Sequence, residues 1–108
     1  MANATRVSSE ARGYFIGHYT GTTAAQNIHI GFKPSHILAW DRTNGDVVWV
    51  WSSANITGVV GMIAGTVATN ASVITQVDNG TTIGFALPAS NSIVNLDSAT
   101  YDFIAWPA

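Results

Sequence analysis

The segment 35–52, SHILAWDRTNGDVVWVWS, limits the possible folds of this chain more than any other part of the sequence. Its centre, Asn44-Gly45, separates two apolar runs. Because both residues tolerate positive φ, they predict a two-residue hairpin turn. A turn at this place pairs Trp40 with Trp49 across the two strands. A packed aromatic pair of this kind contributes about 0.5–1.5 kcal/mol beyond the area it buries.

Both faces of the predicted hairpin are apolar. In this register the large side chains divide between two faces, Leu38, Trp40, Val47, Trp49 and Trp51 on one and Ile37, Ala39, Val48 and Val50 on the other. A strand that faces water on one side alternates apolar with polar residues, and these strands do not. We therefore expect a hairpin core of Leu38, Trp40 and Trp49 on one side, and a second sheet or a neighbouring subunit on the other.

The rest of the chain is typical of short strands separated by turn residues. Val, Ile, Thr and aromatic residues dominate it, and no segment keeps a helical period over three turns. The expected strands are 13–20, 26–30, 72–77, 82–87 and 100–106, with short buried strands joined by a glycine bend in 56–68 and a loop at 88–98. About eight strands at this spacing predict an all-β fold, a single antiparallel β-sandwich or a small β-barrel.

A chain of 108 residues holds one domain, and its first twelve residues differ from the rest. Residues 1–12 are polar and have no evident strand pattern. We therefore expect an N-terminal contact arm at 1–12 and a β domain at 13–108. The arm is expected to grip another chain, with Arg6, Val7 and Glu10 at that interface.

Charged residues make up only 9% of the chain, against about 25% in ordinary soluble domains, and hydrophobic residues make up 47%. A small domain has a large surface for its volume and needs polar groups to cover it, so this composition disfavours a solitary monomer. We expect a homo-oligomer in which another subunit covers apolar surface. Besides the arm, the residues expected at that interface are Trp49, Trp51, Ile56, Val59, Met62 and Ile63.

The sequence disfavours several classes of function. The four cations are scattered rather than clustered, which disfavours nucleic-acid binding, and the apolar stretch 56–68 is too short to span a membrane. The chain has no cysteine, and His18, His29 and His36 stand at spacings of 11 and 7, which match no metal-site pattern. Most aspartates lie next to predicted turns or strand ends, where they bond to nearby backbone. We expect no catalytic residue, no metal and no cofactor.

The four tryptophans, Trp40, Trp49, Trp51 and Trp106, leave two interpretations open. Buried in the core or at a subunit interface, they supply large apolar contact areas. Exposed beside Asn and Asp, they stack on sugars. The sequence favours the core or interface interpretation and keeps glycan binding as the alternative.

Four motifs follow one another along the chain: GFKPS at 31–35, DRTNGD at 41–46 before a Trp-rich strand, ITQVDNGTTIG at 74–84 and TYDFIAW at 100–106. In this order they resemble a β-module of tailed-bacteriophage virion proteins, over residues 13 to 106. A free-standing module of this size resembles a capsid decoration (cement) protein, which sits on the outer shell in many copies, commonly as trimers.

The resemblance implies a non-enzymatic structural protein that binds the outer capsid and stabilises the shell. Its partners would be the major capsid protein and further copies of itself, as a trimer. It would be made in the host cytoplasm and end on the outer capsid surface of the virion. The resemblance carries over no catalytic residue. The alternative is a tail- or fibre-associated module that binds a host-surface glycan.

Overall fold

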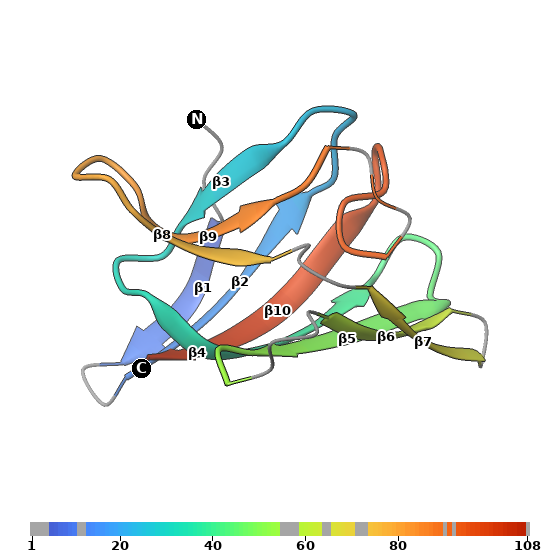
Figure 1. The fold of residues 1–108 in the computed structure, drawn as a ribbon, viewed down its shortest axis with the longest axis horizontal. Coiled ribbons are helices and arrows are strands. Elements are labelled where there is room, and N and C mark those ends of the chain that lie inside the picture. Colours follow the sequence, from blue (N-terminus) through green and yellow to red (C-terminus); the bar gives the residue numbers. More distant parts are fainter. Residues whose placement is uncertain are drawn as a thin grey trace.

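Ten β-strands and no helix make up the part of the chain that the computed structural model describes (Figure 1). The structure describes residues 5–10, 13–54, 59–63, 66–70, 74–89, 91 and 93–107, with the backbone alone at 5–10, 59–63 and 66–70. The strands are β1 (Thr5–Glu10), β2 (Tyr14–Thr20), β3 (Gln26–His29), β4 (Pro34–Asp41), β5 (Val47–Ser52), β6 (Val59–Ile63), β7 (Thr66–Asn70), β8 (Thr75–Asp78), β9 (Ile83–Leu87) and β10 (Thr100–Pro107).

The strands form two antiparallel sheets that pack as a sandwich. The large sheet has the strand order β1-β2-β10-β4-β5-β6-β7, and the small sheet has the order β3-β9-β8. Figure 1 shows the small sheet lying over one face of the large sheet. The prediction of an antiparallel β-sandwich is confirmed, with ten strands in the described residues rather than about eight. The short strands expected within 56–68 are the β6–β7 hairpin.

We call the side of the large sheet that faces the small sheet the inner face, and the opposite side the outer face. On the inner face, Tyr19 and Tyr101 lie directly opposite each other and stack with ring centroids 4.9 Å apart. Phe15 and Phe103 stack at 5.6 Å. Phe85 of β9 meets the ring of Phe103 edge-on at 5.5 Å, so this aromatic ladder joins the two sheets.

The β4–β5 hairpin is shifted by one residue from the predicted register. Trp40 lies opposite Val48 and Trp49 lies opposite Ala39, so the predicted Trp40–Trp49 pair does not form. Because side chains alternate with a period of two, a shift of one residue in the pairing brings different residues onto each face. The predicted register was therefore wrong, and so was the predicted division of the hairpin into faces.

The turn explains the shift. A type I′ turn needs positive φ at both central residues, but Ser98 is the one described residue other than glycine with positive φ. Gly45, at φ 73°, instead donates its N–H to Asp41 O at 2.9 Å and closes the loop 42–46. The buried carboxylate of Asp41 accepts hydrogen bonds from Asn44 N at 3.0 Å and Asn44 Nδ2 at 2.8 Å. This carboxylate holds the longer loop and so sets the register.

The observed register gives the hairpin one buried face and one exposed face. Trp49 lies in the core, as predicted, but Leu38 and Trp40 lie on the outer face, so their assignment to the hairpin core was wrong. The side chains of Trp49 and Trp51, expected at a subunit interface, also lie in the chain's own core. They fail as interface residues because both side chains lie on the inner face, in the rows of Ala39 and Ile37, where the chain's own core covers them.

Residues 5–10 form β1, which pairs with β2, so the expectation of an arm outside the β domain was wrong for these residues. The pairing is antiparallel and contains a bulge between Arg6 and Ser8. An edge strand does not need the apolar alternation of a buried strand, which is why the polar sequence TRVSSE hid it. Residues 1–4 and 11–12 lie outside the described residues.

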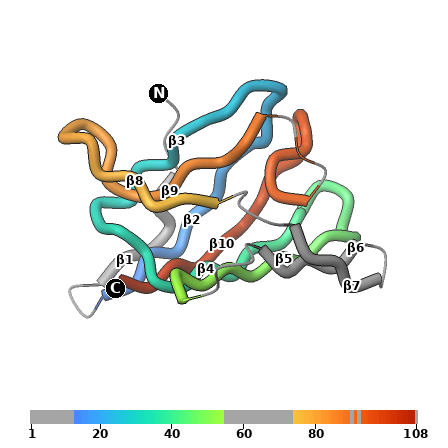
Figure 2. Tube along the Cα trace, in the orientation of Figure 1, coloured from blue at the N-terminus to red at the C-terminus, as the bar shows by residue number. Residues whose placement is uncertain are grey.

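The loop between β9 and β10 closes one end of the sandwich by crossing to the β2–β3 loop (Figure 2). Asn95, fully buried in this loop, accepts hydrogen bonds at Oδ1 from Thr22 N and Gln26 Nε2, both at 2.9 Å. Its Nδ2 donates to Ala24 O at 3.1 Å and to Pro88 O at 2.7 Å. Because both ends of the amide are satisfied, this one side chain ties three segments together.

Candidate functional site

The outer face of the large sheet carries the side chains that alternate with the buried core residues. From β2 to β5 they are Tyr14, Ile16 and His18, Asp102, Ile104 and Trp106, His36, Leu38 and Trp40, and Val48, Val50 and Ser52. Every one of them is exposed or half-buried, whereas the inner-face neighbours are mostly buried. The outer face is therefore the candidate interaction surface.

Four large apolar side chains on the outer face are exposed. The exposed fractions are 37% for Trp40, 43% for Val48, 42% for Val50 and 40% for Trp106. Trp40 lies opposite Val48, and Val50 lies opposite Leu38, so exposed apolar side chains adjoin one another across β4 and β5. A contiguous exposed apolar area on a soluble domain is typical of a binding surface.

An open pocket of about 270 Å³ lies next to this area. Leu38, Val50 and Trp106 line it with apolar atoms, and His36 stands on its wall. Ser35 lies beside this histidine, with Oγ 3.0 Å from His36 Nδ1, and its hydroxyl donates to Pro107 O at 2.7 Å. That donation occupies the serine proton, so the pair is not arranged as a nucleophile and its base. The pocket suits an apolar side chain.

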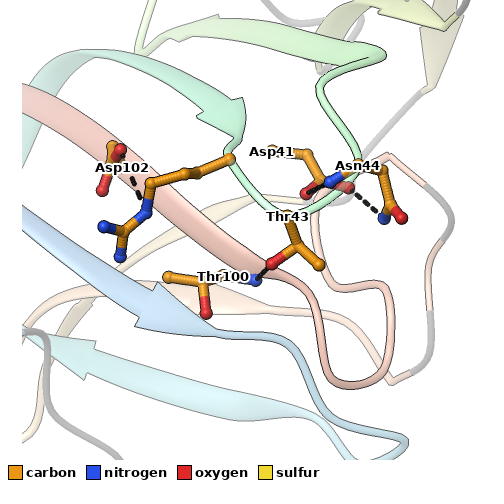
Figure 3. A network of polar contacts seen from close by, with 6 residues as sticks. Asp41, Thr43, Asn44, Thr100 and Asp102 are labelled. Carbon is orange, nitrogen blue, oxygen red and sulfur yellow. Dashed lines mark hydrogen bonds and ion pairs between the residues drawn. The ribbon is translucent and has the colours of Figure 1, made fainter.

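The other end of the outer face carries charge. Arg42 Nε lies 3.5 Å from Asp102 Oδ2, and Asp102 is directly opposite His18 on β2. Nearby, Thr100 N donates to Thr43 Oγ1 at 2.8 Å, which ties the β4–β5 loop to the start of β10 (Figure 3). An exposed ion pair of this kind contributes little to stability. The outer face is therefore divided into a charged part and an uncharged part.

The uncharged part of the outer face comes from one continuous stretch of the sequence. From Val47 to Val77 the sequence contains no Asp, Glu, Lys, Arg or His, and this stretch includes β5, β6 and β7. One row in register across the large sheet, from β2 to β7, consists of His18, Asp102, Trp40, Val48, Met62 and Val67. The row begins with two ionisable residues and ends with four uncharged ones. Three of the seven strands of the large sheet, β5, β6 and β7, are thus without charge.

Most of the other predicted interface residues belong to strands of which the structure describes the backbone alone. Their interface role stays a prediction for Val59, Met62 and Ile63 in β6 and for Arg6, Val7 and Glu10 in β1. Ile56 lies outside the described residues. The predicted interface list contained none of the four exposed residues of the outer face, Trp40, Val48, Val50 and Trp106. The predicted register put Trp40 in the hairpin core and put Val48 and Val50 on the face expected to meet a second sheet or a neighbouring subunit.

Two buried tyrosines have raised pKa values. Burial raises the pKa of Tyr101 to about 12, although the N–H of Leu96, which donates to its hydroxyl at 3.2 Å, acts in the opposite direction. Burial, and then the neighbouring Tyr101, raises the pKa of Tyr19 well above its ordinary value. Tyr19 donates to Val94 O at 2.7 Å. The nearby indole N–H of Trp49 acts in the opposite direction and lowers the pKa of Tyr19. Within the described residues, this buried Nε1 has no acceptor at the distance and angle of a hydrogen bond. Burial is thus the largest cause of both raised pKa values.

The three histidines lie in different parts of the sandwich. His18 is on β2 and His36 on β4, while Nδ1 of His29 in the small sheet accepts a hydrogen bond from Ile83 N at 3.1 Å. Within the part of the chain that the structure describes, no group of three or more His, Asp or Glu residues is suited to a metal ion. The same part contains no helix long and apolar enough to cross a membrane.

Sequence reasoning missed two polar features of the site's framework. The spacing Asp41-Arg42-Thr43-Asn44 is compatible with an Asp side chain that bonds to the backbone of its own turn, and this pattern could have indicated the longer loop. Asn95 had no such indication, because its partners at residues 22–26 are far away in the sequence.

No protein-family model, curated protein sequence or solved structure matches this chain.

Proposed function

We propose that this chain is a non-enzymatic structural protein of a bacteriophage virion, a head decoration protein that binds the outer capsid as a homo-oligomer. The observation that carries the proposal is the contiguous exposed apolar area of Trp40, Val48, Val50 and Trp106 on the outer face. The order of motifs that resembles tailed-phage virion modules supplies the biological setting. The partner in this proposal is the major capsid protein.

A decoration protein acts by binding alone. Its free energy of binding across the junctions between capsid subunits adds to what expansion or internal pressure has to overcome. The molecule measures 35 × 27 × 24 Å, so a side of it is large enough to supply the roughly 800 Å² that each partner contributes to a standard interface. Burial of the outer face over β5, β6 and β7, which contain no charged residue, also requires little desolvation of ions.

The pocket beside the exposed area adds an anchor point. A protein interface commonly depends on one or two large side chains that fill a pocket on the partner. The pocket of about 270 Å³ between Trp106, Leu38 and Val50 has the size and the apolar lining for such a side chain. In the proposed complex, a capsid residue fills this pocket while Trp40 packs on the surrounding shell surface.

Co-sedimentation tests the proposal. Capsid shells assembled from the major capsid protein of the same genome are mixed with the wild-type chain or with the double variant Val48→Lys/Val50→Lys. We expect the wild type to sediment with the shells and the variant to bind at least tenfold more weakly. The matched control is Thr23→Lys/Ala25→Lys, which adds the same charge at the same spacing to an exposed loop away from the outer face.

Two results would contradict the proposal. The first is a wild-type chain that stays in the supernatant at every ratio of chain to shell. The second is equal loss of binding in both double variants, which would indicate a general effect of charge rather than a role of the outer face. Circular dichroism of each variant checks that the β-fold is retained.

A host-surface glycan is the second candidate ligand, favoured by one observation. Asp102 lies directly opposite Trp40, and Arg42 is 3.5 Å from the same carboxylate. An exposed ring beside carboxylate and guanidinium groups can stack on a sugar and bond to its hydroxyls. Titration of the chain with host polysaccharide would then change the tryptophan fluorescence of the wild type but not of Trp40→Phe. An unchanged wild-type spectrum rules this candidate out.

A further inference from the structure

The strand β7 ends the large sheet, and no described strand pairs with its outer edge. All five of its residues pair with β6 in a regular register, from Thr66 opposite Ile63 to Asn70 opposite Val59. In an antiparallel ladder, alternate N–H and C=O groups of an edge strand point away from the sheet. β7 therefore presents a row of backbone groups to which another strand can bond.

The opposite edge of the large sheet is built differently. β1 contains a bulge between Arg6 and Ser8, and its sequence includes two charged residues, Arg6 and Glu10. Charges and bulges are the usual means by which proteins prevent a sheet edge from pairing with another chain. β7, with the sequence TVATN, has no charge, no proline and no bulge. One edge is protected against pairing and the other is not.

The lack of charge extends beyond β7 itself. It lies in the stretch from Val47 to Val77, which contains no ionisable Asp, Glu, Lys, Arg or His. Two copies that approach each other by this edge therefore meet without charge repulsion over three strands on each side. A second copy of the chain is also present wherever the protein is, at the concentration of the protein itself.

We propose that β7 pairs antiparallel with β7 of a second copy about a two-fold axis, so that one continuous sheet runs through both copies. A register centred on Ala68 uses the whole strand: Ala68 lies opposite itself, and Thr66 lies opposite Asn70. Such a contact is self-complementary, because each residue of one copy meets its symmetric counterpart. The inference rests on the self-association that the proposed function includes, but it does not require capsid binding.

The pairing has a consequence for the outer face. Val50, exposed on β5, is in register with Val60 of β6 and Thr69 of β7. Joining two copies at β7 places the uncharged strands β5, β6 and β7 of the two large sheets side by side, away from the ion pair of Arg42 and Asp102. The pair of copies then offers one uncharged outer face about twice as wide as that of a single copy. A two-fold contact of this kind differs from the trimer that the family resemblance implies.

Disulfide trapping tests the register. The chain contains no cysteine, so Ala68→Cys introduces a single thiol at the proposed axis. Opposite residues of an antiparallel pair have Cβ atoms about 4.5–5.5 Å apart, close to the roughly 3.5–4.5 Å of a disulfide. With oxidised glutathione we expect Ala68→Cys to form a covalent dimer at least tenfold faster than the control Thr23→Cys, which carries its thiol on an exposed loop.

A second variant tests the contact without relying on a thiol. Thr69→Lys places a positive charge on each side of the axis, and we expect the dissociation constant of the dimer, measured by native mass spectrometry, to rise at least tenfold. Thr23→Lys is the control and should leave the constant unchanged. Amide hydrogen exchange of residues 66–70 in the wild type should slow as protein concentration rises.

The outcomes separate this inference from the proposed function. Equal cross-linking of Ala68→Cys and Thr23→Cys, or a trimer that Thr69→Lys leaves intact, overturns the β7 pairing. If Ala68→Cys does not fold, unchanged exchange of residues 66–70 over the concentration range overturns it instead. A monomeric Thr69→Lys variant that still sediments with capsid shells supports the β7 pairing and shows that capsid binding is a separate property.

Discussion

Trp40 and Trp49 lie on neighbouring strands of one hairpin, in opposite surroundings. Trp49 is fully buried on the inner face, and Trp40 is more than one third exposed on the outer face. Inner-face rings stack on each other and on the small sheet, so their burial is complete within the chain. The outer face is also apolar in its uncharged part, but the described residues leave it open. The comparison teaches that this sequence contains more large apolar side chains than its own core buries.

The largest expected effect comes from truncating the two tryptophans separately. Trp49→Ala removes a fully buried ring, and large-to-small changes of this kind cost about 3–5 kcal/mol. Trp40→Ala removes a partly exposed ring and should cost less than about 1 kcal/mol. Urea unfolding of both variants measures the difference. Similar losses of unfolding free energy in the two variants would contradict the distinction between a buried inner face and an exposed outer face. If Trp49→Ala does not fold, Trp49→Phe is used in its place.

The next effect concerns the buried amide that closes the inner layer. Asn95→Ala leaves two donors and two acceptors without their partner, and we expect a loss of about 3 kcal/mol in unfolding free energy. Asn95→Asp keeps the shape but turns a carboxylate oxygen toward Ala24 O and Pro88 O. That variant should be at least as unstable at pH 7 and should recover part of its stability near pH 4, where a protonated acid can donate. A stability of Asn95→Asp equal to wild type at pH 7 would contradict the role of Nδ2.

The two faces also differ in how well the sequence predicted them. Alternation in 13–20 and 100–106 separates the buried residues Phe15, Tyr19, Tyr101 and Phe103 from their exposed or half-buried neighbours, because glycine, alanine and aromatic residues occupy one face of each strand. The hairpin failed because its two faces are both apolar, so hydrophobicity could not choose between two registers that differ by one residue. The choice depends on Asp41, a buried carboxylate whose burial becomes apparent only in the folded chain.

A similar limit applies to the surface. The low charge of the sequence correctly led to the expectation of apolar surface. Which residues form that surface depends on the pairing register of the β4–β5 hairpin, and the predicted register was wrong. β1 was missed because the sequence TRVSSE has the composition of a loop, and its strand form depends on pairing with β2. Local sequence thus predicted the strands well, while contacts distant in the sequence decided which residues face outward.

A smaller effect should appear at alkaline pH. The pKa of Tyr101 is about 12 in the folded chain, and an unfolded tyrosine has a pKa of about 10. The neutral phenol therefore stabilises the fold fully below pH 10, and this contribution is lost as the pH rises from 10 toward 12. Tyr101→Phe should cost about 1 kcal/mol at pH 8, through loss of the bond from Leu96 N, and less at pH 11. A constant difference between pH 8 and 11, measured by urea unfolding, would contradict this account.

The smallest expected effect belongs to the charged part of the outer face. Asp102→Asn breaks the ion pair with Arg42, whose side chain is more than half exposed, so the unfolding free energy should change by less than about 0.5 kcal/mol. The effect should decrease further in 0.5 M salt. A loss above about 2 kcal/mol would mean that this part of the outer face contributes to the fold as the inner face does.

Hydroxyl-radical footprinting of the free and the capsid-bound chain tests the central claim most directly, since it reports the solvent access of each tryptophan. The account predicts that Trp40 and Trp106 are oxidised in the free chain and protected on the shell, while Trp49 stays unreactive in both states. The exposed loop at Thr23 to Ala25 should react equally in both. Equal oxidation of Trp40 and Trp106 in the free and bound chain would contradict the claim that the outer face is the docking surface.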